Sequence, residues 1–336
     1  AYMERPVRIG RLSASLRPGL FIVEDVVIEG LTPDAAPFLK AERIALRVPL
    51  QTLIRRQLII EAEMDRWAMT IEMFAGNRNN IPRLRPRSTE PGRFQTNINY
   101  IWARGGWFRL IDHAQPLDFT AEQVAVNFTY AANLDKHVAT VAFRGGVTNI
   151  LSYEPMRLDS MSARLSFDKG NLLTVQGLDL VTDGTRSHMT GVINLNTWPE
   201  LYFDIATAFD VAPLKEIFFF GQNFTATGRG EYKGRFQKFQ NGKYDVTGGF
   251  KVPGFNVSGL DFPQLSGHVV WMQNRLEVIG AESPFYGGKL RLSYVLDSHG
   301  GARGSIADLS ATYKQVDMTE FGRVMNWQGI ELASRA

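Results

Sequence analysis

The residue types that most often carry out covalent or metal chemistry occur in this chain of 336 residues, but their spacing fits none of the common reaction centres. The histidines form no H-x-H or H-E-x-x-H pattern, and none has a carboxylate at metal-site spacing. No serine lies in a G-x-S-x-G elbow, and the lack of cysteine excludes thiol nucleophiles and thiolate metal sites. We therefore expect a protein that is not an enzyme, with no catalytic residue, metal or cofactor. The five histidines are His113, His137, His188, His268 and His299.

Two stretches invite a phosphate-binding interpretation. Residues 228–234 read G-R-G-E-Y-K-G, but the glycine spacing differs from that of a phosphate-cradling loop. The stretch also lies among predicted strands, where glycine usually marks a bulge or bend. Arg83, Arg85, Arg87 and Arg93 fall in a Pro-rich stretch, and arginine pairs well with phosphate oxygens. Because clustered loop charges usually keep a loop solvated, we interpret this second stretch as a connecting loop.

Alternation of apolar and polar residues is the dominant signal in the chain. Ile44, Leu46 and Val48 share one parity, whereas Arg43 and Arg47 share the other. Successive side chains of a strand point to opposite faces, so such a strand has one apolar and one largely solvated face. Many later segments repeat the alternation, and Gly, Asn and Asp turns separate them. This pattern is typical of antiparallel meanders. Three of the turn pairs are Asp183-Gly184, Asn241-Gly242 and Gly287-Gly288.

Composition places the chain among folded proteins, with 44% hydrophobic and 21% charged residues. The net charge of +3 suits an anionic lipid surface and is too small to indicate a nucleic-acid partner. The chain contains no run of eighteen or more apolar residues, so its sequence predicts no membrane-spanning helix. The chain begins at Ala1 within a strand-like pattern, without a signal sequence, so we interpret it as an excised piece of a longer protein.

The order of the motifs resembles the N-terminal module of AsmA-like envelope proteins, the AsmA/TamB group. The matching motifs are P-G-x-F at 18–21, V-x-I-x-G at 26–30, P-F-L-x-A-x-x-I at 37–44, V-P-L at 48–50 and a G-N-x-N-x-P close at 76–82. Arg78 and Asn79 make that close slightly longer than in the family. F-Y-G-G-K-L-R-L at 285–292 and D-V-A-P-L at 210–214 fit the later family pattern. The resemblance covers most of the chain and is strongest at 5–82 and 160–320.

The resemblance implies a repeating, lipid-conducting β-groove on the periplasmic face of the bacterial cell envelope, with an inner-membrane anchor before the start of this chain. We predict a mainly all-β fold: an elongated, curved antiparallel sheet that forms a hydrophobic groove, with a few short helices. The predicted parts are an N-terminal AsmA-like β module (1–82), a Pro/Arg-rich connecting loop (83–98) and a repeated β-meander groove segment (99–336). Asp210 and Asp317 are candidate N-caps of two short helices.

The predicted lipid-contacting residues are the apolar members of the alternating segments. Alternation alone does not distinguish a groove lining from the closed core of two β-sandwiches, and the resemblance favours the groove. The predicted lining is Ile44, Leu46, Val48, Trp67, Met69, Ile71, Met73, Val124, Val126, Phe128, Met161, Leu165, Phe167, Leu173, Val175, Leu201, Phe203, Ile205, Phe250, Leu276, Val278, Leu290, Leu292 and Tyr294.

The predicted function is passive transport of phospholipid or another acyl lipid between the inner and outer membranes, in support of outer-membrane biogenesis. The alternative is an outer-membrane protein assembly or translocation module that binds client β-strands at open sheet edges. A third interpretation is an adhesion or scaffold sandwich with a filled core. The predicted partners are a phospholipid, the inner membrane through the anchor, and an outer-membrane protein, with no nucleic acid.

Overall fold

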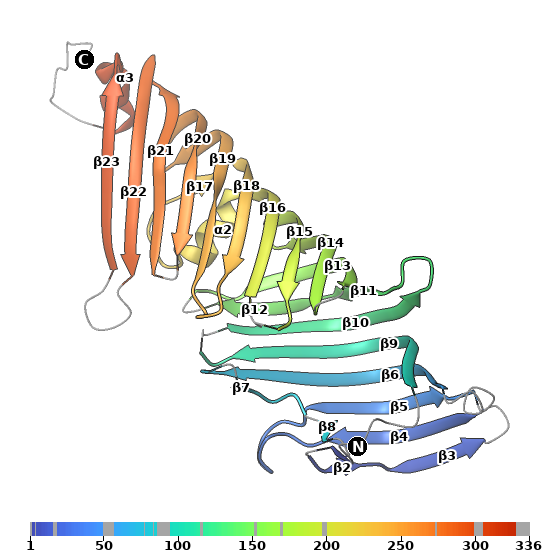
Figure 1. The fold of residues 1–336 in the computed structure, drawn as a ribbon. Helices are drawn as coiled ribbons and strands as arrows, with labels where there is room; N and C mark the ends of the chain where they lie inside the picture. Colours follow the sequence, from blue (N-terminus) through green and yellow to red (C-terminus); the bar gives the residue numbers. More distant parts are fainter. Residues whose placement is uncertain are drawn as a thin grey trace. The chain divides into compact units, whose positions relative to one another are not determined.

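The computed structural model describes residues 2–3, 5–15, 19–49, 57–76, 78–82, 84–85, 95–114, 117–150, 153–168, 171–196, 200–272, 274–298 and 305–326. These residues form strands almost throughout, with two short helices, which confirms the predicted all-β class with few helices (Figure 1). The chain divides into two compact units, unit 1 (Ala1–Thr182) and unit 2 (Asp183–Ala336). The predicted N-terminal module and connecting loop both fall inside unit 1.

Nine strands of unit 1 form one continuous layer in the order β3, β4, β5, β6, β9, β10, β11, β13 and β14 (Figure 1). Neighbours are antiparallel except β6 and β9, which are parallel, so the predicted meander has one exception. The nine are β3 (Arg11–Ser15), β4 (Leu20–Ile28), β5 (Leu39–Arg47), β6 (Gln57–Phe74), β9 (Gln95–Asp112), β10 (Leu117–Ala131), β11 (Lys136–Arg144), β13 (Met156–Asp168) and β14 (Leu172–Thr182).

Five short strands complete unit 1. Strand β2 (Val7–Arg8) pairs with β4, and β7 (Arg78–Asn79) pairs with β6. Strand β12 (Gly146–Ile150) pairs with both β10 and β13. Strands β1 (Tyr2–Met3) and β8 (Leu84–Arg85) pair with each other. Of the four arginines in the predicted loop, only Arg85 lies within the described residues.

A line of residues in the left-handed backbone region crosses the layer of unit 1. In the register of β6 and β9, Asp65 pairs with Arg104 and Ala68 with Trp107, which sets Arg66 opposite Gly105. An irregularity of this kind bends a strand and re-aims its side chains, so β4, β6, β9 and β10 bend at one common level. The line consists of Asp25 (φ 54°), Arg66 (φ 46°), Gly105 (φ 60°), Gln123 (φ 49°) and Gly145 (φ 83°).

Eight strands of unit 2 pair in series, all antiparallel, in the order β15, β16, β18, β19, β20, β21, β22 and β23. They are β15 (Thr185–Asn194), β16 (Glu200–Asp210), β18 (Arg229–Lys238), β19 (Tyr244–Val257), β20 (Leu260–Met272), β21 (Arg275–Phe285), β22 (Gly288–Ser298) and β23 (Ser305–Lys314). The two-residue strand β17 (Ala226–Thr227) pairs with β19.

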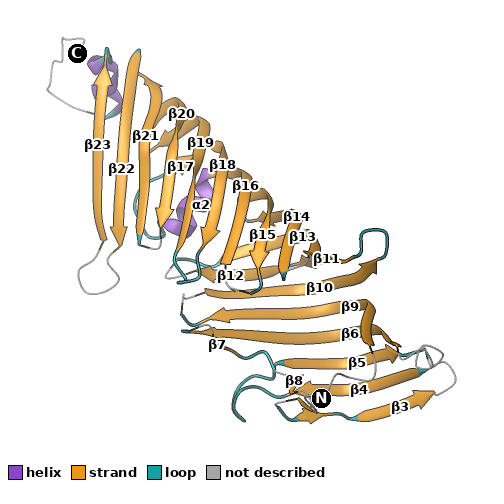
Figure 2. Ribbon diagram, in the orientation of Figure 1, coloured by secondary structure: helices purple, strands orange, loops and turns teal. Residues whose placement is uncertain are grey.

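Both described helices belong to unit 2 (Figure 2). Helix α2 (Val211–Phe218) follows Asp210, whose side chain makes no capping hydrogen bond and pairs instead with Arg229 at 2.9 Å. Helix α3 (Met318–Val324) begins at Asp317, whose carboxylate accepts hydrogen bonds from the Thr319 and Glu320 amides. The two predicted helices are therefore present, but the predicted side-chain cap forms only at Asp317.

The described residues of each unit include one cluster of buried apolar side chains. In unit 1 the cluster lies on both sides of the line of left-handed residues, and it includes Trp67, Val124, Phe143 and Leu158. In unit 2 the cluster of Phe262, Leu265, Ala281, Phe285 and Val316 packs against α3 through Met318 and Phe321.

Candidate functional site

Two neighbouring cross-strand rows of apolar residues traverse unit 1 from β4 to β14. Cross-strand partners lie on the same face of a sheet, so each row is an unbroken apolar line perpendicular to the strands. The first row is Val23, Ile44, Met64, Ala103, Val126, Val141, Ala163 and Leu178. The second row is Phe21, Leu46, Ala62, Ile101, Phe128, Ala139, Leu165 and Val175.

The opposite face of unit 1 carries a row of alternating charges. Arg11, Glu24, Arg43, Asp65 and Arg104 are successive cross-strand partners in β3, β4, β5, β6 and β9. The Asp65 carboxylate lies 3.2 Å from Arg43 and 3.1 Å from Arg104. The apolar rows and the charged row are on opposite sides of the same strands, so the layer has one apolar face and one solvated face.

The register places the predicted residues of unit 1 relative to these rows. Ile44 and Val126 belong to the first row, and Leu46, Phe128, Leu165 and Val175 belong to the second. The other predicted residues of this face lie to either side of the two rows. Val48 lies just after β5, and its amide donates to the Gly19 carbonyl oxygen at 2.8 Å. The residues beside the rows are Trp67, Met69, Ile71, Met73, Val124, Met161, Phe167 and Leu173. Their contact with lipid stays a prediction.

The predicted residues include six of the sixteen members of the two rows, and one reason for the misses is that left-handed residues change the parity within a strand. In β10, Phe119 and Ala121 share the apolar face with Val124 and Val126. Around Gln123, two successive residues of this face are therefore three positions apart in the sequence instead of two. In β6, the same change at Arg66 puts Met64 and Trp67 on one face. Periodicity alone does not show where a non-glycine residue adopts positive φ, so these changes of parity could not be found from the sequence.

Two similar rows traverse unit 2 from β15 to β23. Neither contains a charged residue, although glycine replaces an apolar side chain at three places. The first row is Gly191, Phe203, Phe236, Val246, Trp271, Leu276, Leu296 and Ala307. The second row is Met189, Ile205, Gly234, Gly248, Val269, Val278, Tyr294 and Leu309.

The predicted residues of unit 2 lie in these rows or next to them. Leu201 lies at the rim, because its partner in β18 is Lys238. Phe250 pairs with Tyr232 and Gly267, and Leu292 pairs with Ala281. Leu290 pairs with Ser283 and, in β23, with Tyr313. The members within the rows are Phe203, Ile205, Leu276, Val278 and Tyr294.

The two helices contact parts of this face. The Phe218 ring of α2 meets the Trp271 ring edge-on at 6.0 Å, and Phe321 of α3 lies 5.6 Å from Phe285. The row residues of β15 and β16 are only half-buried, and Leu309 in β23 is 69% exposed. The apolar face of unit 2 is therefore partly accessible.

Among the described residues, two polar side chains on the apolar faces are buried without a hydrogen-bond partner. The atoms concerned are Trp67 Nε1 and the Tyr232 hydroxyl oxygen. Burial raises the pKa of Tyr232 to about 12 because the phenolate would lose its hydration. Burial likewise raises the pKa of Tyr294. At one rim of unit 1, His137 stacks on Phe128 at 4.8 Å between ring centroids. The faces are thus hydrophobic.

Other kinds of site find no support in the described part of the chain. No group of three or more His, Cys, Asp or Glu side chains there is arranged to hold a metal ion. Neither described helix has the length and hydropathy that a membrane span requires. The G-R-G-E-Y-K-G stretch lies almost wholly in β18, with Gly230 and Gly234 on the apolar face.

Comparison of the chain with protein-family models, with curated proteins and with solved structures finds no match. The fold and the site themselves define the class: a mainly antiparallel all-β protein whose sheets have one apolar and one charged face.

Proposed function

We propose that the apolar rows bind the acyl chains of lipids, and that the protein is a lipid-carrying segment of an AsmA-like envelope protein. The observation that carries this proposal is the lack of any charged side chain along two neighbouring rows of eight strands in unit 1. The motif order described above supports the family, the periplasmic location and transport of phospholipid between the inner and outer membranes.

The energetics favour a long apolar ligand. Burying one methylene contributes about 0.8 kcal/mol, so a sixteen-carbon chain contributes on the order of 12 kcal/mol when fully covered. Eight strands at a spacing of about 4.8 Å give a row of about 34 Å. A chain that lies along such a row can move by one methylene at a time without leaving the apolar surface. A charge within the row would interrupt that movement.

The layered arrangement supports an accessible face more than a closed sandwich. The nine paired strands of unit 1 form one layer, and the described residues of this unit include no helix that could cover it. Most members of the two rows are half-buried, whereas a filled sandwich core would bury them fully.

One observation favours strand addition as a second function. Every residue from Ile306 to Lys314 in the last strand, β23, is exposed, and among the described strands only β22 pairs with it. An open edge of this kind accepts a further strand by main-chain hydrogen bonds. In this alternative, the ligand is a client strand of an outer-membrane protein, and binding depends on the edge backbone.

The test is native mass spectrometry with lipid extraction of the full chain purified from bacteria. We expect the chain to retain phospholipid, and Phe167→Asp and Leu292→Arg to lose it, because each places a charge on an apolar face. The matched controls Ser162→Asp and Ser310→Arg place the same charges on the opposite face and should keep the lipid. Both control positions are exposed.

Circular dichroism of each variant separates loss of lipid from loss of fold. Normal lipid loading of the folded Phe167→Asp and Leu292→Arg proteins would exclude the proposal. A lipid-free wild-type protein that melts cooperatively and binds no apolar dye would favour the closed sandwich instead.

A further inference from the structure

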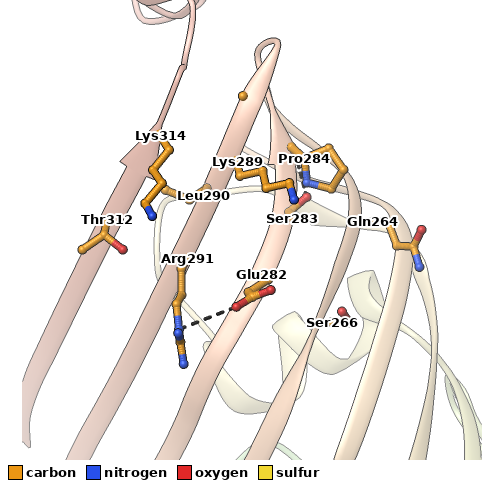
Figure 3. A pocket seen from close by; sticks show the side chains of 11 residues that line it. Gln264, Ser266, Glu282, Ser283, Pro284, Lys289, Leu290, Arg291, Thr312 and Lys314 are labelled. Atoms are coloured by element: carbon orange, nitrogen blue, oxygen red, sulfur yellow. Dashed lines mark hydrogen bonds and ion pairs between the residues drawn. The ribbon is translucent and has the colours of Figure 1, made fainter. Parts of the chain in front are cut away.

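The charged face of unit 2 contains two adjoining hollows, of about 560 and 520 Å³, that share Ser266 and Glu282. Their charged side chains lie on the face opposite the apolar rows, although Leu290 and Phe250 of the predicted lipid lining also border the hollows. The first hollow is lined by Lys289, Arg291 and Lys314 (Figure 3), and the second by Lys233 and Lys251. Five cationic side chains and two carboxylates, Glu231 and Glu282, therefore line the pair of hollows.

One cross-strand row through the hollows is electrically balanced. Glu231 pairs with Lys251, and Glu282 pairs with Arg291. The Arg291 guanidinium lies 3.7 Å from Glu282, and both side chains are about two-thirds exposed, so the ion pair is weak and free to rearrange. The full row is Glu231, Lys251, Ser266, Glu282, Arg291 and Thr312.

The excess positive charge lies beside that row. Lys289 and Lys314 are direct cross-strand partners, and like charges placed directly opposite each other destabilise a sheet. Within the described residues, no carboxylate lies within ion-pairing distance of Lys233, Lys289 or Lys314. Figure 3 shows Lys289 and Lys314 on neighbouring strands beside Arg291. A bound anion would remove the repulsion between the two lysines.

The hollows exist because small residues replace side chains on this face. Gly249 lines the second hollow, and an ideal Cβ placed there meets nothing nearer than the Gly267 carbonyl oxygen at 3.8 Å. Gly280 interrupts β21 with a positive φ of 56°, next to Arg291. The open space is thus bounded by cations and by the polar side chains of Gln264, Ser266 and Thr312.

We propose that the first hollow binds a phosphate group, either free in solution or carried by the head group of an anionic lipid. Two lysines and one arginine provide point charge and a guanidinium fork, and Thr312 and Gln264 add neutral donors. This combination matches an anion with several oxygens better than it matches a planar carboxylate.

The test uses two probes with the full chain at low salt. Calorimetry measures binding of inorganic pyrophosphate, and co-sedimentation measures binding to phosphatidylcholine vesicles with and without phosphatidic acid. Lys289→Gln/Lys314→Gln should weaken binding at least tenfold, and Gly249→Glu should weaken it too, because a carboxylate would enter the adjoining hollow. Lys40→Gln/Lys243→Gln removes the same charge at two exposed positions outside the hollows and should change binding less than twofold.

Pyrophosphate binding that only the hollow variants lose supports the site and identifies a soluble phosphate compound as the class of ligand. Binding only to vesicles with phosphatidic acid, lost in the same variants, supports the site and identifies the lipid head group. Absence of binding to both probes overturns the proposal, and so does an equal loss in the Lys40→Gln/Lys243→Gln control, since that would show non-specific attraction.

Discussion

Leu158 in unit 1 and Leu290 in unit 2 both lie on an apolar sheet face, but they are buried to different extents. Leu158 is 2% exposed and belongs to a cluster that also includes Trp67, Val124 and Phe143, whereas Leu290 is only half-buried at the edge of the second cluster. The same alternating sequence pattern thus produces a filled core in one place and a partly open surface in another.

The bends in the strands account for this difference. In unit 1 the line of left-handed residues brings apolar residues on both sides of the bend into one cluster, such as Met69 and Met64 around Trp67. In unit 2, β15 and β16 contain no residue with positive φ and no buried side chain. The buried cluster of unit 2 instead lies after Gly254 in the chain, on both sides of Gly280, and both of these glycines have positive φ. Burial therefore follows strand bending more than hydrophobicity, which leaves the straighter strands of unit 2 with the more accessible face.

The largest expected effect contrasts a buried with a half-buried phenylalanine. Phe143→Ala should lower the free energy of unfolding by about 3–5 kcal/mol, because a 3% exposed ring leaves a cavity. Phe203→Ala, at a half-buried row position of β16, should cost about half as much. Urea denaturation measures both, and hydrogen exchange by mass spectrometry assigns each loss to its unit. Equal losses would show that the two faces are buried alike.

A pair of glycines provides a smaller contrast. Gly106→Ala in unit 1 should cost about 1–3 kcal/mol, because a Cβ there would lie 2.2 Å from the Trp67 ring. Gly249→Ala on the charged face of unit 2 meets only open space and should leave stability unchanged or raise it by up to about 1 kcal/mol. Thermal melts of the two variants give the comparison, and a stable Gly106→Ala protein would show that the Trp67 ring is free to move.

Alkaline pH should affect unit 2 through Tyr232, whose pKa is raised to about 12 from 10.0 by burial. Because the folded state disfavours the phenolate, the stability that the neutral Tyr232 side chain contributes is fully present below about pH 10. It is lost as the pH rises towards 12. Partial exposure limits the loss to about 1–2 kcal/mol. Denaturation at pH 9 and pH 11.5 should show this loss in the wild type and a smaller one in Tyr232→Phe. An unchanged pH dependence in Tyr232→Phe would assign the loss to other groups.

The smallest expected effect tests the bend itself. Gln123→Gly should raise the stability of unit 1 by about 0.5 kcal/mol, because glycine adopts the φ of 49° without strain but loses more backbone entropy on folding. Thr140→Gly, at an exposed and ordinary strand position of β11, should instead lower stability by about 0.5–1 kcal/mol. The two variants are compared by urea denaturation, and a loss in both would contradict the strained bend.

Much of the fold could be predicted from the sequence, because strand formation depends on local alternation and turn residues. The strands around Ile44, Val126 and Leu165 have the predicted parity, and Asp317 caps a short helix as predicted. The parallel pairing of β6 and β9 was not predicted, since it joins segments across a long connection. The side chain of Asp210 pairs with Arg229 instead of capping α2, because that partner comes from a different strand.

The candidate site shows the same division between local and tertiary information. The amino-acid sequence by itself determined which residues are apolar, that strands alternate with turns, and that each strand has a hydrophobic and a polar face. Only the tertiary structure decided which residues form continuous rows, because register and the left-handed bends arise from pairing between distant segments. It also decided that Lys289 and Lys314 are cross-strand neighbours, since they lie in different strands and repel each other.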